Sequence, residues 1–361
     1  MNLIETPTKK YREVEQTLRR EIESGLWPAG GQLPPAQELA KRFKVANMTI
    51  RQAVTGLLEE GLLVRIQGKG TFIVEREQAP AEIGTRYPMA LLFPTEWQRR
   101  DSYYFSELLN GFQQVIQDNG HKAPVLDYDT AETPGALEPG TAVACVILEE
   151  PHQQLVERLR DRGFRVLAVN HYTGRRSIPC VRIDDNQGLA DAVEHLISRG
   201  HERIGFLRGV PNNVDAMDRL RAFRAAVRDN ELRGAVEVGD DFIESAGYEA
   251  AQRLLSSPNP PTAIICASDL SAIGAVRAVR DRGLSVPHDL SVIGYGDFSV
   301  ADYVIPRLTT IRQPRLLLGA TAAEMLIHLA NDEDVADVLL SAELMVREST
   351  SRHVSALATA V

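Results

Sequence analysis

The hydrophobic positions at the front of the chain recur at helical spacing and then give way to short strand-like runs. The stripe Val14, Leu18 and Ile22 falls on every fourth residue, which predicts a helix over roughly 10–25. Two further helices are predicted, one directly after Pro34-Pro35 and one over roughly 46–60. The β-prone runs 62–64 and 71–74 flank a short glycine-containing turn and predict a hairpin. Residues 33–74 therefore have the order of a helix-turn-helix followed by a β wing.

Beyond residue 86 the rhythm changes, because short apolar runs alternate with longer helical patterns. The predicted strands are 88–93, 123–128, 143–148, 165–170, 203–207, 262–266 and 290–294. The predicted helices are 103–119, 151–162, 187–199, 217–230, 246–256 and 269–282. Strands that alternate with helices imply parallel sheets with right-handed crossovers. Because about 275 residues exceed one typical sheet, we expect an α/β fold with two lobes.

These patterns divide the chain into three parts. Residues 1–76 form the predicted winged helix-turn-helix, 77–86 a linker, and 87–361 the two-lobed domain. In open parallel sheets, ligands bind beyond the carboxyl ends of the strands. With two lobes facing each other, we expect a ligand in the cleft between them.

Composition narrows the function classes. The 361 residues, 44% of them hydrophobic and 25% charged, fit a globular protein of two or three domains. No apolar run approaches the roughly 18 residues of a membrane span, and the N-terminus lacks the apolar stretch of a secretory signal, so we expect a cytoplasmic protein with no membrane partner. Three widely spaced cysteines, Cys145, Cys180 and Cys266, indicate neither a disulfide framework nor a zinc site.

The net charge of −9 is divided unevenly along the chain. Residues 1–76 carry 12 basic and 9 acidic side chains, a balance of +3 (12 minus 9), which leaves −12 for the remainder. The excess of basic charge therefore lies on the predicted DNA-binding part, where contacts to phosphate groups would require it.

The start of the third helix carries side chains suited to nucleic acid. Asn47, Met48, Thr49, Arg51 and Gln52 include amides, a hydroxyl and a guanidinium, which reach base edges and phosphates when a helix enters the major groove. In the wing, Lys69 lies between Gly68 and Gly70, so a cationic turn can approach the backbone or minor groove closely. The alternative for each residue alone is a solvated helix face or an ordinary surface hairpin. The order of the elements favours DNA.

Polar and aromatic residues fall at the strand ends of the two-lobed part. Asn170, Asp269 and Asp297 each follow an apolar run, Arg219 opens a helix, and Tyr104 lies at the first strand-to-helix turn. Aromatic faces with Arg and Asp groups suit a sugar or a heterocycle. The alternatives are a helix N-cap for Asp269 and a surface or lobe-interface aromatic for Tyr104.

Catalytic and cofactor motifs are not found in the sequence. His195 and His201 lie six apart, which does not favour a metal, and we expect them to be helix-end and turn residues. The turn 209–213 lacks the remainder of a phosphate-binding loop, and there is no nucleophile elbow or dinucleotide fingerprint. We expect no cofactor, no metal and no enzymatic activity.

The first part matches a known pattern at many positions: Tyr11, Leu18, Ile22, Gly25, Gly30, Leu33, Pro34, Glu38, Leu39, Ala40, Val45, Thr49, Arg51, Ala53, Gly61 and the wing residues 68–72. On these residues it resembles the winged helix-turn-helix of GntR-type regulators. The resemblance implies that Thr49 and Arg51 contact DNA and that the Gly68 wing reaches the minor groove. The family's usual Ser-Arg pair is Ala46-Asn47 here, its polar second-helix residue is Gln37, and Pro35 replaces a capping Ser. We expect a changed operator preference, since an Arg-to-guanine contact is lost.

The second part carries its own set of motifs: Tyr104-Phe105 through Gly111, Ile183–Gly188, His195 through Ile204, Arg219 and Phe223, Asp241 through Tyr248, Ala267 through Ala275, Ser291–Tyr295, Leu308–Pro314 and Leu344–Thr350. On these it resembles the LacI-type effector domain, which has the fold of type I periplasmic binding proteins. The resemblance implies an effector site at Tyr104, Arg219, Phe242 and Asp269. The family's first acid after the late strand is Gly296 here, and Asp297 is a candidate substitute. Where the family usually has an Asp, this chain has Asn170.

Together the two resemblances predict a ligand-responsive transcriptional regulator. We expect a homodimeric repressor, each subunit of which reads one half-site of a near-palindromic operator in double-stranded DNA. The partner that relieves repression is expected to be a small carbohydrate or related polar metabolite, although a co-repressor remains open. A solute-binding protein and an α/β enzyme are the alternatives; the first has no use for residues 1–76, and the second lacks a catalytic motif.

Overall fold

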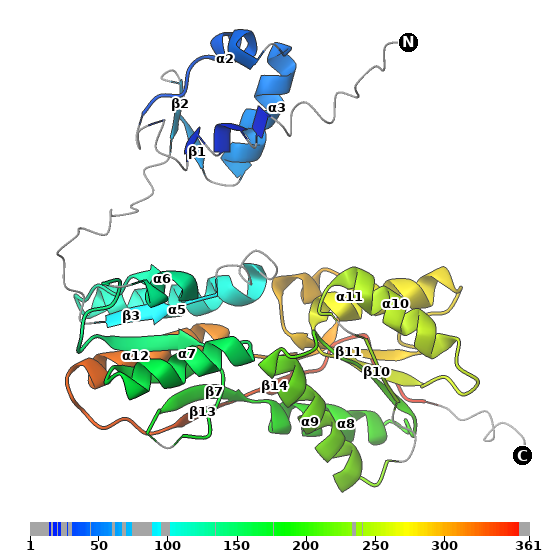
Figure 1. Cartoon of the computed structure of the whole chain (residues 1–361). Helices are drawn as coiled ribbons and strands as arrows, with labels where there is room; N and C mark the ends of the chain where they lie inside the picture. The colour runs from blue at the N-terminus through cyan, green and yellow to red at the C-terminus, as the bar shows by residue number, and fades with distance from the viewer. Residues whose placement is uncertain are drawn as a thin grey trace, which may run out of the picture. The chain divides into compact units, whose positions relative to one another are not determined.

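The computed structural model of the chain describes residues 14–15, 17–19, 21–22, 27, 31–43, 45–59, 62–66, 70–73, 89–94, 102–133, 135–175, 177–232, 236–239 and 241–353. The chain forms two compact units, Met1–Thr85 and Arg86–Val361 (Figure 1). The predicted linker 77–86 lies outside the described residues, so its boundaries stay a prediction.

The small unit has the predicted helices and hairpin. Helix α2 spans Ala36–Phe43 and α3 spans Asn47–Glu59, while the antiparallel strands β1 (Leu63–Ile66) and β2 (Gly70–Ile73) pair Leu63 with Ile73. In the first predicted helix, the seven described positions between Val14 and Ile22 are all helical. The stripe residues Val14, Leu18, Ile50 and Leu57 are buried in one core, as the spacing predicts.

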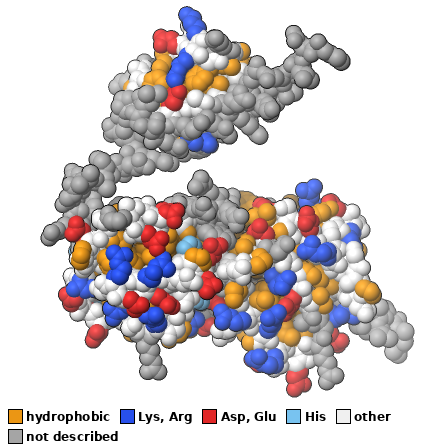
Figure 2. Space-filling view, in the orientation of Figure 1, with side chains coloured by type: hydrophobic (Ala, Val, Ile, Leu, Met, Phe, Trp, Pro, Cys, Tyr) orange, Lys and Arg blue, Asp and Glu red, His pale blue; other side chains and the backbone are white. Residues whose placement is uncertain are grey.

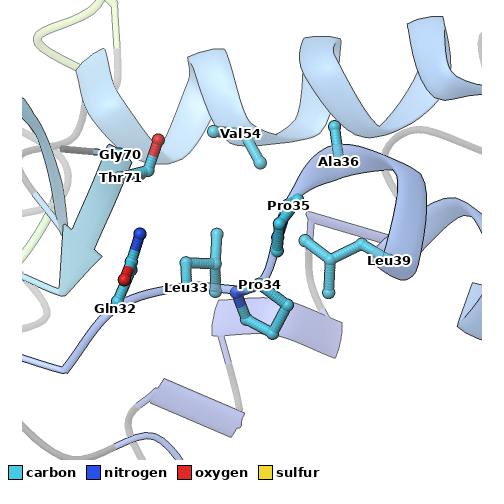
Figure 3. Close-up of a pocket in the computed structure, with 9 residues that line it drawn as sticks. All are labelled: Gln32, Leu33, Pro34, Pro35, Ala36, Leu39, Val54, Gly70 and Thr71. Carbon is cyan, nitrogen blue, oxygen red and sulfur yellow. The ribbon is translucent and has the colours of Figure 1, made fainter. Parts of the chain in front are cut away.

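The wing is fastened to the helices by a third, short backbone pairing. Leu33 N donates to Thr71 O at 2.8 Å, and Ile73 N donates to Gly31 O at 2.9 Å. Between this segment, α2, α3 and β2 lies an apolar cavity of about 200 Å³, into which Leu33 and Val54 face (Figure 3). Gly70 has a φ of +123°, and a Cβ there would lie 2.5 Å from Gln32 Nε2, so the wing begins at a glycine for a steric reason.

The large unit consists of two lobes, each with a six-stranded sheet. In the first lobe the order is β13 (Val338–Ser341), β7 (Cys180–Asp184), β6 (Arg165–Val169), β5 (Ala142–Val146), β3 (Met89–Leu92) and β4 (Val125–Leu126), all parallel. The second-lobe order is β14 (Glu343–Met345), β12 (Thr309–Arg312), β11 (Ser291–Gly296), β10 (Ala263–Cys266), β8 (Ile204–Leu207) and β9 (Val236–Val238). In this sheet only the β12–β14 pair is antiparallel among the described strands.

Helices cover the sheets of both lobes. The first lobe has α5 (Ser102–Asp118), α6 (Tyr128–Glu132), α7 (Glu150–Asp161) and α12 (Arg315–Ala330). The second has α8 (Asp185–Ile197), α9 (Val214–Asp229), α10 (Glu244–Leu255), α11 (Asp269–Asp281) and the short 3₁₀ helix η1 (Ser299–Asp302). Strands β3, β5, β10 and β11 are buried along their whole length, as expected for strands covered on both faces.

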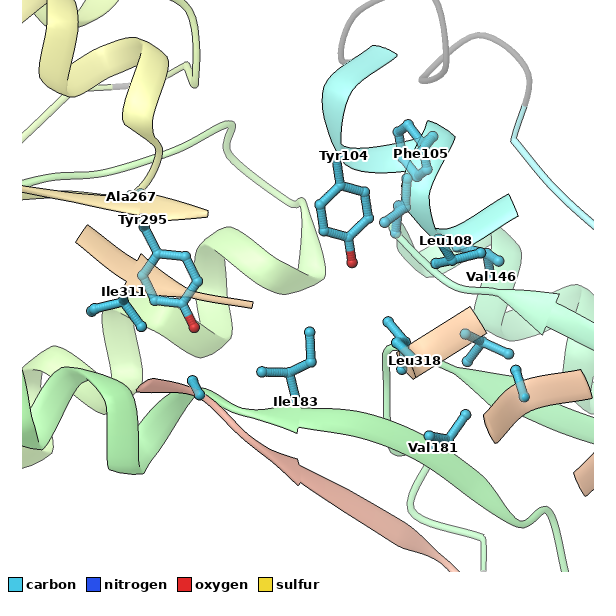
Figure 4. Close-up of a cluster of buried hydrophobic side chains, with 14 of the residues drawn as sticks. Tyr104, Phe105, Leu108, Val146, Val181, Ile183, Ala267, Tyr295, Ile311 and Leu318 are labelled. Carbon is cyan, nitrogen blue, oxygen red and sulfur yellow. The ribbon is translucent and has the colours of Figure 1, made fainter. Parts of the chain in front are cut away.

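The chain passes between the lobes three times. The crossings follow β7 at Asp184-Asp185, β12 at 313–314, and β13 at Ala342. Because each lobe is assembled from separate stretches of sequence, the strand ends of both lobes meet at one place. One buried cluster includes Tyr104 from α5 and Tyr295 from β11, whose hydroxyl groups are directed toward the space between the lobes (Figure 4).

The α/β fold class with two lobes is confirmed, and the predicted strands and helices of the large unit are all present. The prediction missed the edge strands β9, β13 and β14, the strands β7 and β12 next to an edge, and the helices α6 and α12. The described residues contain no helix of the length and apolar character that a bilayer crossing requires.

Candidate functional site

Two predicted DNA contacts lie side by side on the small unit. Gln37 of α2 and Asn47 of α3 line the same shallow surface hollow with Lys41, and Met48 is 77% exposed. Thr49 is half-buried, and Gly70 is exposed at the start of the wing strand. The side chain of Arg51, and Gly68 and Lys69 entirely, lie outside the described residues. Their assignment to DNA stays a prediction.

In the large unit, a cavity of about 250 Å³ lies between the lobes. Its lining includes five aromatic side chains: Tyr104 and Phe105 from the first lobe, and Phe242, Tyr295 and Phe298 from the second. The remaining lining residues are Leu148, Asn213, Asp215, Arg219, Asp241, Ile243, Ser268, Leu270 and Gln313. An aromatic wall with a few polar groups is the usual lining of a small-molecule site. Three of the predicted effector residues, Tyr104, Arg219 and Phe242, are brought together here.

Arg219 is the cation of this cavity and is only 5% exposed. Its Nη1 donates to Ala267 O at 2.8 Å, its Nη2 lies 3.6 Å from Asp215 Oδ2, and its Nε lies 3.9 Å from Asp185 Oδ1. The guanidinium carbon stands 4.2 Å from the centre of the Tyr295 ring. Burial lowers the pKa of Arg219, but the charges of Asp215 and Asp185 more than reverse this effect, so the side chain remains a cation.

Asp185 begins α8 immediately after the first crossing between the lobes. Burial raises its pKa to about 6, against which the nearby charge of Arg219 acts. The Tyr295 hydroxyl donates to Asp185 Oδ1, and burial holds the pKa of Tyr295 well above its ordinary value. The donated proton therefore stays on the phenol, and Asp185, Tyr295 and Arg219 form one buried network.

Asn170 joins the two lobes through its side-chain amide. The Tyr104 hydroxyl donates to Asn170 Oδ1 at 2.9 Å, and Asn170 Nδ2 donates to Asp215 Oδ1 at 2.6 Å on α9 of the other lobe. A backbone contact lies near it, since Val214 N donates to Leu148 O at 2.8 Å. We call the Tyr104–Asn170–Asp215 chain the interlobe bridge. Asn170 thus contacts two cavity residues without itself lining this cavity.

Asp269 is placed differently from the prediction. It is fully buried and does not line the cavity, because its carboxylate accepts from Thr310 Oγ1 at 2.5 Å and from Phe298 N at 2.7 Å. Burial raises its pKa to about 6. The alternative role as a helix N-cap is wrong, since Ser268 caps α11 by accepting from Ser271 N. Asp269 holds the backbone of a cavity residue, Phe298.

Asp297, which was predicted to contact the effector, points away from the cavity. Its carboxylate forms ion pairs with Arg312 at 2.7 Å and Arg347 at 2.6 Å, and it lines neither interlobe cavity. It therefore does not replace the acid missing at Gly296. At Gly296 the backbone φ is +129°, and a Cβ would lie 3.0 Å from the Phe298 ring. An aromatic ring occupies the space that a side chain at 296 would enter.

A second, more polar cavity of about 290 Å³ lies on the other side of the interlobe bridge. Asn170, His171, Arg182, Asp218 and Arg221 contribute to its lining, and it shares Asp215 and Gln313 with the aromatic cavity. Burial lowers the pKa of His171, so this imidazole is neutral near pH 7. His195 and His201 bond instead to Thr350, Thr262 and Ser351, which makes them structural, and no metal-binding cluster is found within the described residues.

Five residues of the site were not predicted from the sequence: Asp185, Asp215, Tyr295, Phe298 and Gln313. Each lies at a strand end, a crossing or a first helical turn, which is the signal that could have identified them. These residues come together only because both sheets are built from strands that are not consecutive in sequence. A local sequence pattern does not indicate such an arrangement.

Comparisons with known proteins agree with both halves of the chain. Residues 10–73 match the family "Bacterial regulatory proteins, gntR family", and residues 193–350 match the family "Periplasmic binding protein-like domain". The chain is 30% identical to the arabinose metabolism transcriptional repressor of Geobacillus stearothermophilus, over 94% of this chain and 97% of that protein. It is 31% identical to the HTH-type transcriptional repressor CytR of Escherichia coli, over 68% of this chain and 75% of that protein.

Solved structures show the same fold in the large unit. A LacI transcriptional regulator from a Rhodococcus species superimposes with a TM-score of 0.63 at 25% identity, covering 73% of this chain and 98% of that one. Both sequence resemblances, to GntR-type readers and to LacI-type effector domains, are confirmed.

Proposed function

This chain belongs to the family of bacterial transcriptional repressors that join a GntR-type DNA-binding domain to a periplasmic-binding-protein-like domain. On this basis we propose that a small polar effector bound between its lobes controls its affinity for operator DNA. The observation that carries the proposal is the aromatic cavity between the lobes. Its walls come from both lobes, Tyr104 from one and Arg219 and Phe242 from the other. A ligand that touches both walls favours one lobe geometry, which is what a switch requires.

We propose that the DNA-binding surface consists of the start of α3 and the wing. Gln37, Asn47, Met48, Thr49 and Arg51 would enter or flank the major groove. The turn formed by residues 68–70, with Lys69 at its centre, would contact the backbone or minor groove. Exposure of Gln37, Asn47 and Met48 supports this assignment. On the face seen in Figure 2, basic and acidic side chains of the large unit are interspersed, which suits a sensor better than a DNA surface.

The effector of the proposal is a carbohydrate or related polar metabolite. Tyr104, Phe242 and Arg219 would contact it directly, while Asn170 would act through the interlobe bridge. Asp269 and Asp297, first assigned to the effector, would instead support Phe298 and the loop around it. The arabinose in the relative's name belongs to that repressor; for this chain it is one sugar among those to be tested.

We further propose a homodimer in the cytoplasm. An exposed apolar surface around Tyr303 and Ile305, which are 83% and 79% exposed, borders a groove of about 460 Å³ that also includes Ile273 and Val276. A second copy placed on it by a two-fold axis would give two readers for a palindromic operator.

The test is DNA binding by the full-length chain to the promoter fragment of its own gene, measured at several salt concentrations. We expect Arg51→Ala and Lys69→Ala each to weaken binding at least tenfold and to flatten the salt dependence, because phosphate or base contacts are lost. Arg253→Ala, an exposed arginine on α10, serves as the matched control. If both reader variants bind like the control, or if the wild type shows no binding, the proposal is wrong.

A further inference from the structure

We infer that the effector is an uncharged molecule with an apolar ring face, a class that excludes sugar acids, sugar phosphates and nucleotides. This inference rests on the proposed function, since it concerns the occupant of the interlobe cavity. Three features of that cavity support it: the state of its one cation, the ring beside Gly296, and the amide of Gln313.

The first feature is that the charge of Arg219 is already matched. Two carboxylates form ion pairs with its guanidinium nitrogens, Asp215 at 3.6 Å and Asp185 at 3.9 Å, and Nη1 donates a hydrogen bond to Ala267 O. The lining as a whole has one Arg and two Asp side chains, a formal charge of −1 (1 minus 2), even before Asp185 is included. An anionic ligand would have to compete with Asp215 for Arg219 and would face Asp241 as well. A buried anion without its own cation is disfavoured.

The second feature is the ring of Phe298 beside Gly296. Here a Cβ would stand 3.0 Å from the ring, and Phe298 is fixed by its N–H bond to Asp269 and by Arg315, whose guanidinium carbon lies 4.8 Å from the ring centre. A ligand in the cavity therefore meets an aromatic surface at Phe298. Apolar C–H faces and aromatic rings suit such a surface.

The third feature is an uncharged polar group that faces the cavity. Gln313 lies at the second crossing between the lobes, is 4% exposed, and lines both interlobe cavities. Within the described part of the chain its side chain makes no hydrogen bond to protein. An amide that lines a cavity offers a donor and an acceptor to whatever occupies it. A hydroxyl or an amide of a neutral ligand supplies both.

The experiment uses matched ligand pairs on the full-length chain at pH 7.5, with binding measured by calorimetry and by thermal shift. The pairs are galactose with galacturonate, ribose with ribose 5-phosphate, phenyl β-glucoside with phenyl β-glucuronide, and cytidine with cytidine 5′-monophosphate. We expect every ligand that binds the wild type to be the neutral member, with its charged counterpart at least 30-fold weaker. A charged member that binds as tightly as its neutral partner overturns the inference.

A second set of measurements tests whether the carboxylates around Arg219 are what excludes anionic ligands. Asp215→Asn removes one of the two carboxylates that neutralise Arg219, so the acidic members should bind at least tenfold more tightly than they bind the wild type. Asp229→Asn, exposed at the end of the same helix, is the matched control and should leave acid binding unchanged. If Asp215→Asn gains no affinity for any acidic probe, the charge argument is wrong. Release of operator DNA is measured separately. If neutral ligands bind but leave the affinity for operator DNA unchanged, the proposed function is wrong, while the inference that the ligand is uncharged is supported.

Discussion

The interlobe bridge makes Asn170 the most informative residue to change. Its amide accepts from Tyr104 on one side and donates to Asp215 at 2.6 Å on the other. Asn170→Asp preserves the shape and the acceptor but replaces the donor with a second carboxylate. Arg219 is already shared between Asp215 and Asp185, so the added charge has no free cation beside it.

The size of the effect follows from two losses. A hydrogen bond to a charged group contributes about 1.5–3 kcal/mol. Two carboxylates about 4 Å apart repel by about 4 kcal/mol at an effective dielectric constant of about 20, part of which Arg219 offsets. We therefore expect a net loss of about 3 kcal/mol in the free energy of unfolding. For a unit of this size, that corresponds to a fall of about 6–12 °C in Tm.

The sign of the pH dependence is fixed by the same contact. Asp215 raises the folded-state pKa of the introduced carboxyl above its unfolded value of about 3.9, by about two units for about 3 kcal/mol. The penalty is then present in full above about pH 6 and disappears as the pH falls toward 4. The difference in Tm between variant and wild type should accordingly shrink from pH 7.5 to pH 4.5.

The assay is thermal unfolding of the full chain across that pH range with two matched variants. Asn259→Asp, at an exposed position, adds the same charge without the bridge and should change Tm by less than 2 °C, in line with the small effects of surface substitutions. Asn170→Asp combined with Asp215→Asn exchanges donor and acceptor and should recover most of the lost stability. A single variant as stable as wild type at pH 7.5, or a double variant no better than the single one, refutes the bridge.

Three further outcomes follow from other parts of the large unit. Burial raises the pKa of Asp185 to about 6, so its ionisation costs the folded state about 3 kcal/mol, a penalty complete above pH 6 and lost toward pH 4. Asp185→Asn should remove most of this pH-dependent penalty, so that the variant loses less stability than the wild type between pH 4.5 and 7.5 in urea unfolding. Gly296→Ala should destabilise the chain by about 1–3 kcal/mol in the same assay, because φ is +129° and Phe298 must move. Tyr303→Asp together with Ile305→Asp should convert the proposed dimer into a monomer in light scattering, and an unchanged mass would contradict that surface.

The sequence predicted much of the fold because its strongest patterns are local. The runs at β5 and β10 are apolar throughout, and the helices between strands have regular stripes, so both are visible in a single stretch of chain. The strands that were missed, such as β13 and β14, lie at sheet edges with mixed burial and include polar residues. Their place is decided by a neighbour far away in sequence, which periodicity does not report.

The candidate site was predicted in part for a similar reason. The LacI-type resemblance assigned Arg219 and Phe242 to the site, and both line the cavity. Position at a strand end pointed to Asp269 and Asp297, but it could not distinguish a side chain facing the cavity from one facing inward. Asp269 faces inward because Thr310, 41 residues later, supplies a hydroxyl on the neighbouring side. Asp297 turns to Arg347, which is 50 residues away. Both orientations depend on partners that only the assembled sheet brings close.

The interlobe bridge and the cavity together restrict how an effector acts. Asn170 and Asp215 join the lobes at 2.6 Å through groups of the protein alone, and Leu148 and Val214 add a second contact at 2.8 Å. If the proposed effector binds between Tyr104 and Phe242 in this geometry, it reinforces an arrangement that the chain already favours, and it shifts the population only by its differential contacts there. If the bridge is weakened by about 3 kcal/mol, the binding energy of the ligand must supply what the bridge no longer contributes to joining the lobes. The effector concentration needed for half-maximal operator response should then rise by about two orders of magnitude if the joined lobes are the responding state, because each 1.4 kcal/mol is tenfold. A fall instead would identify the separated lobes as the state that the effector favours.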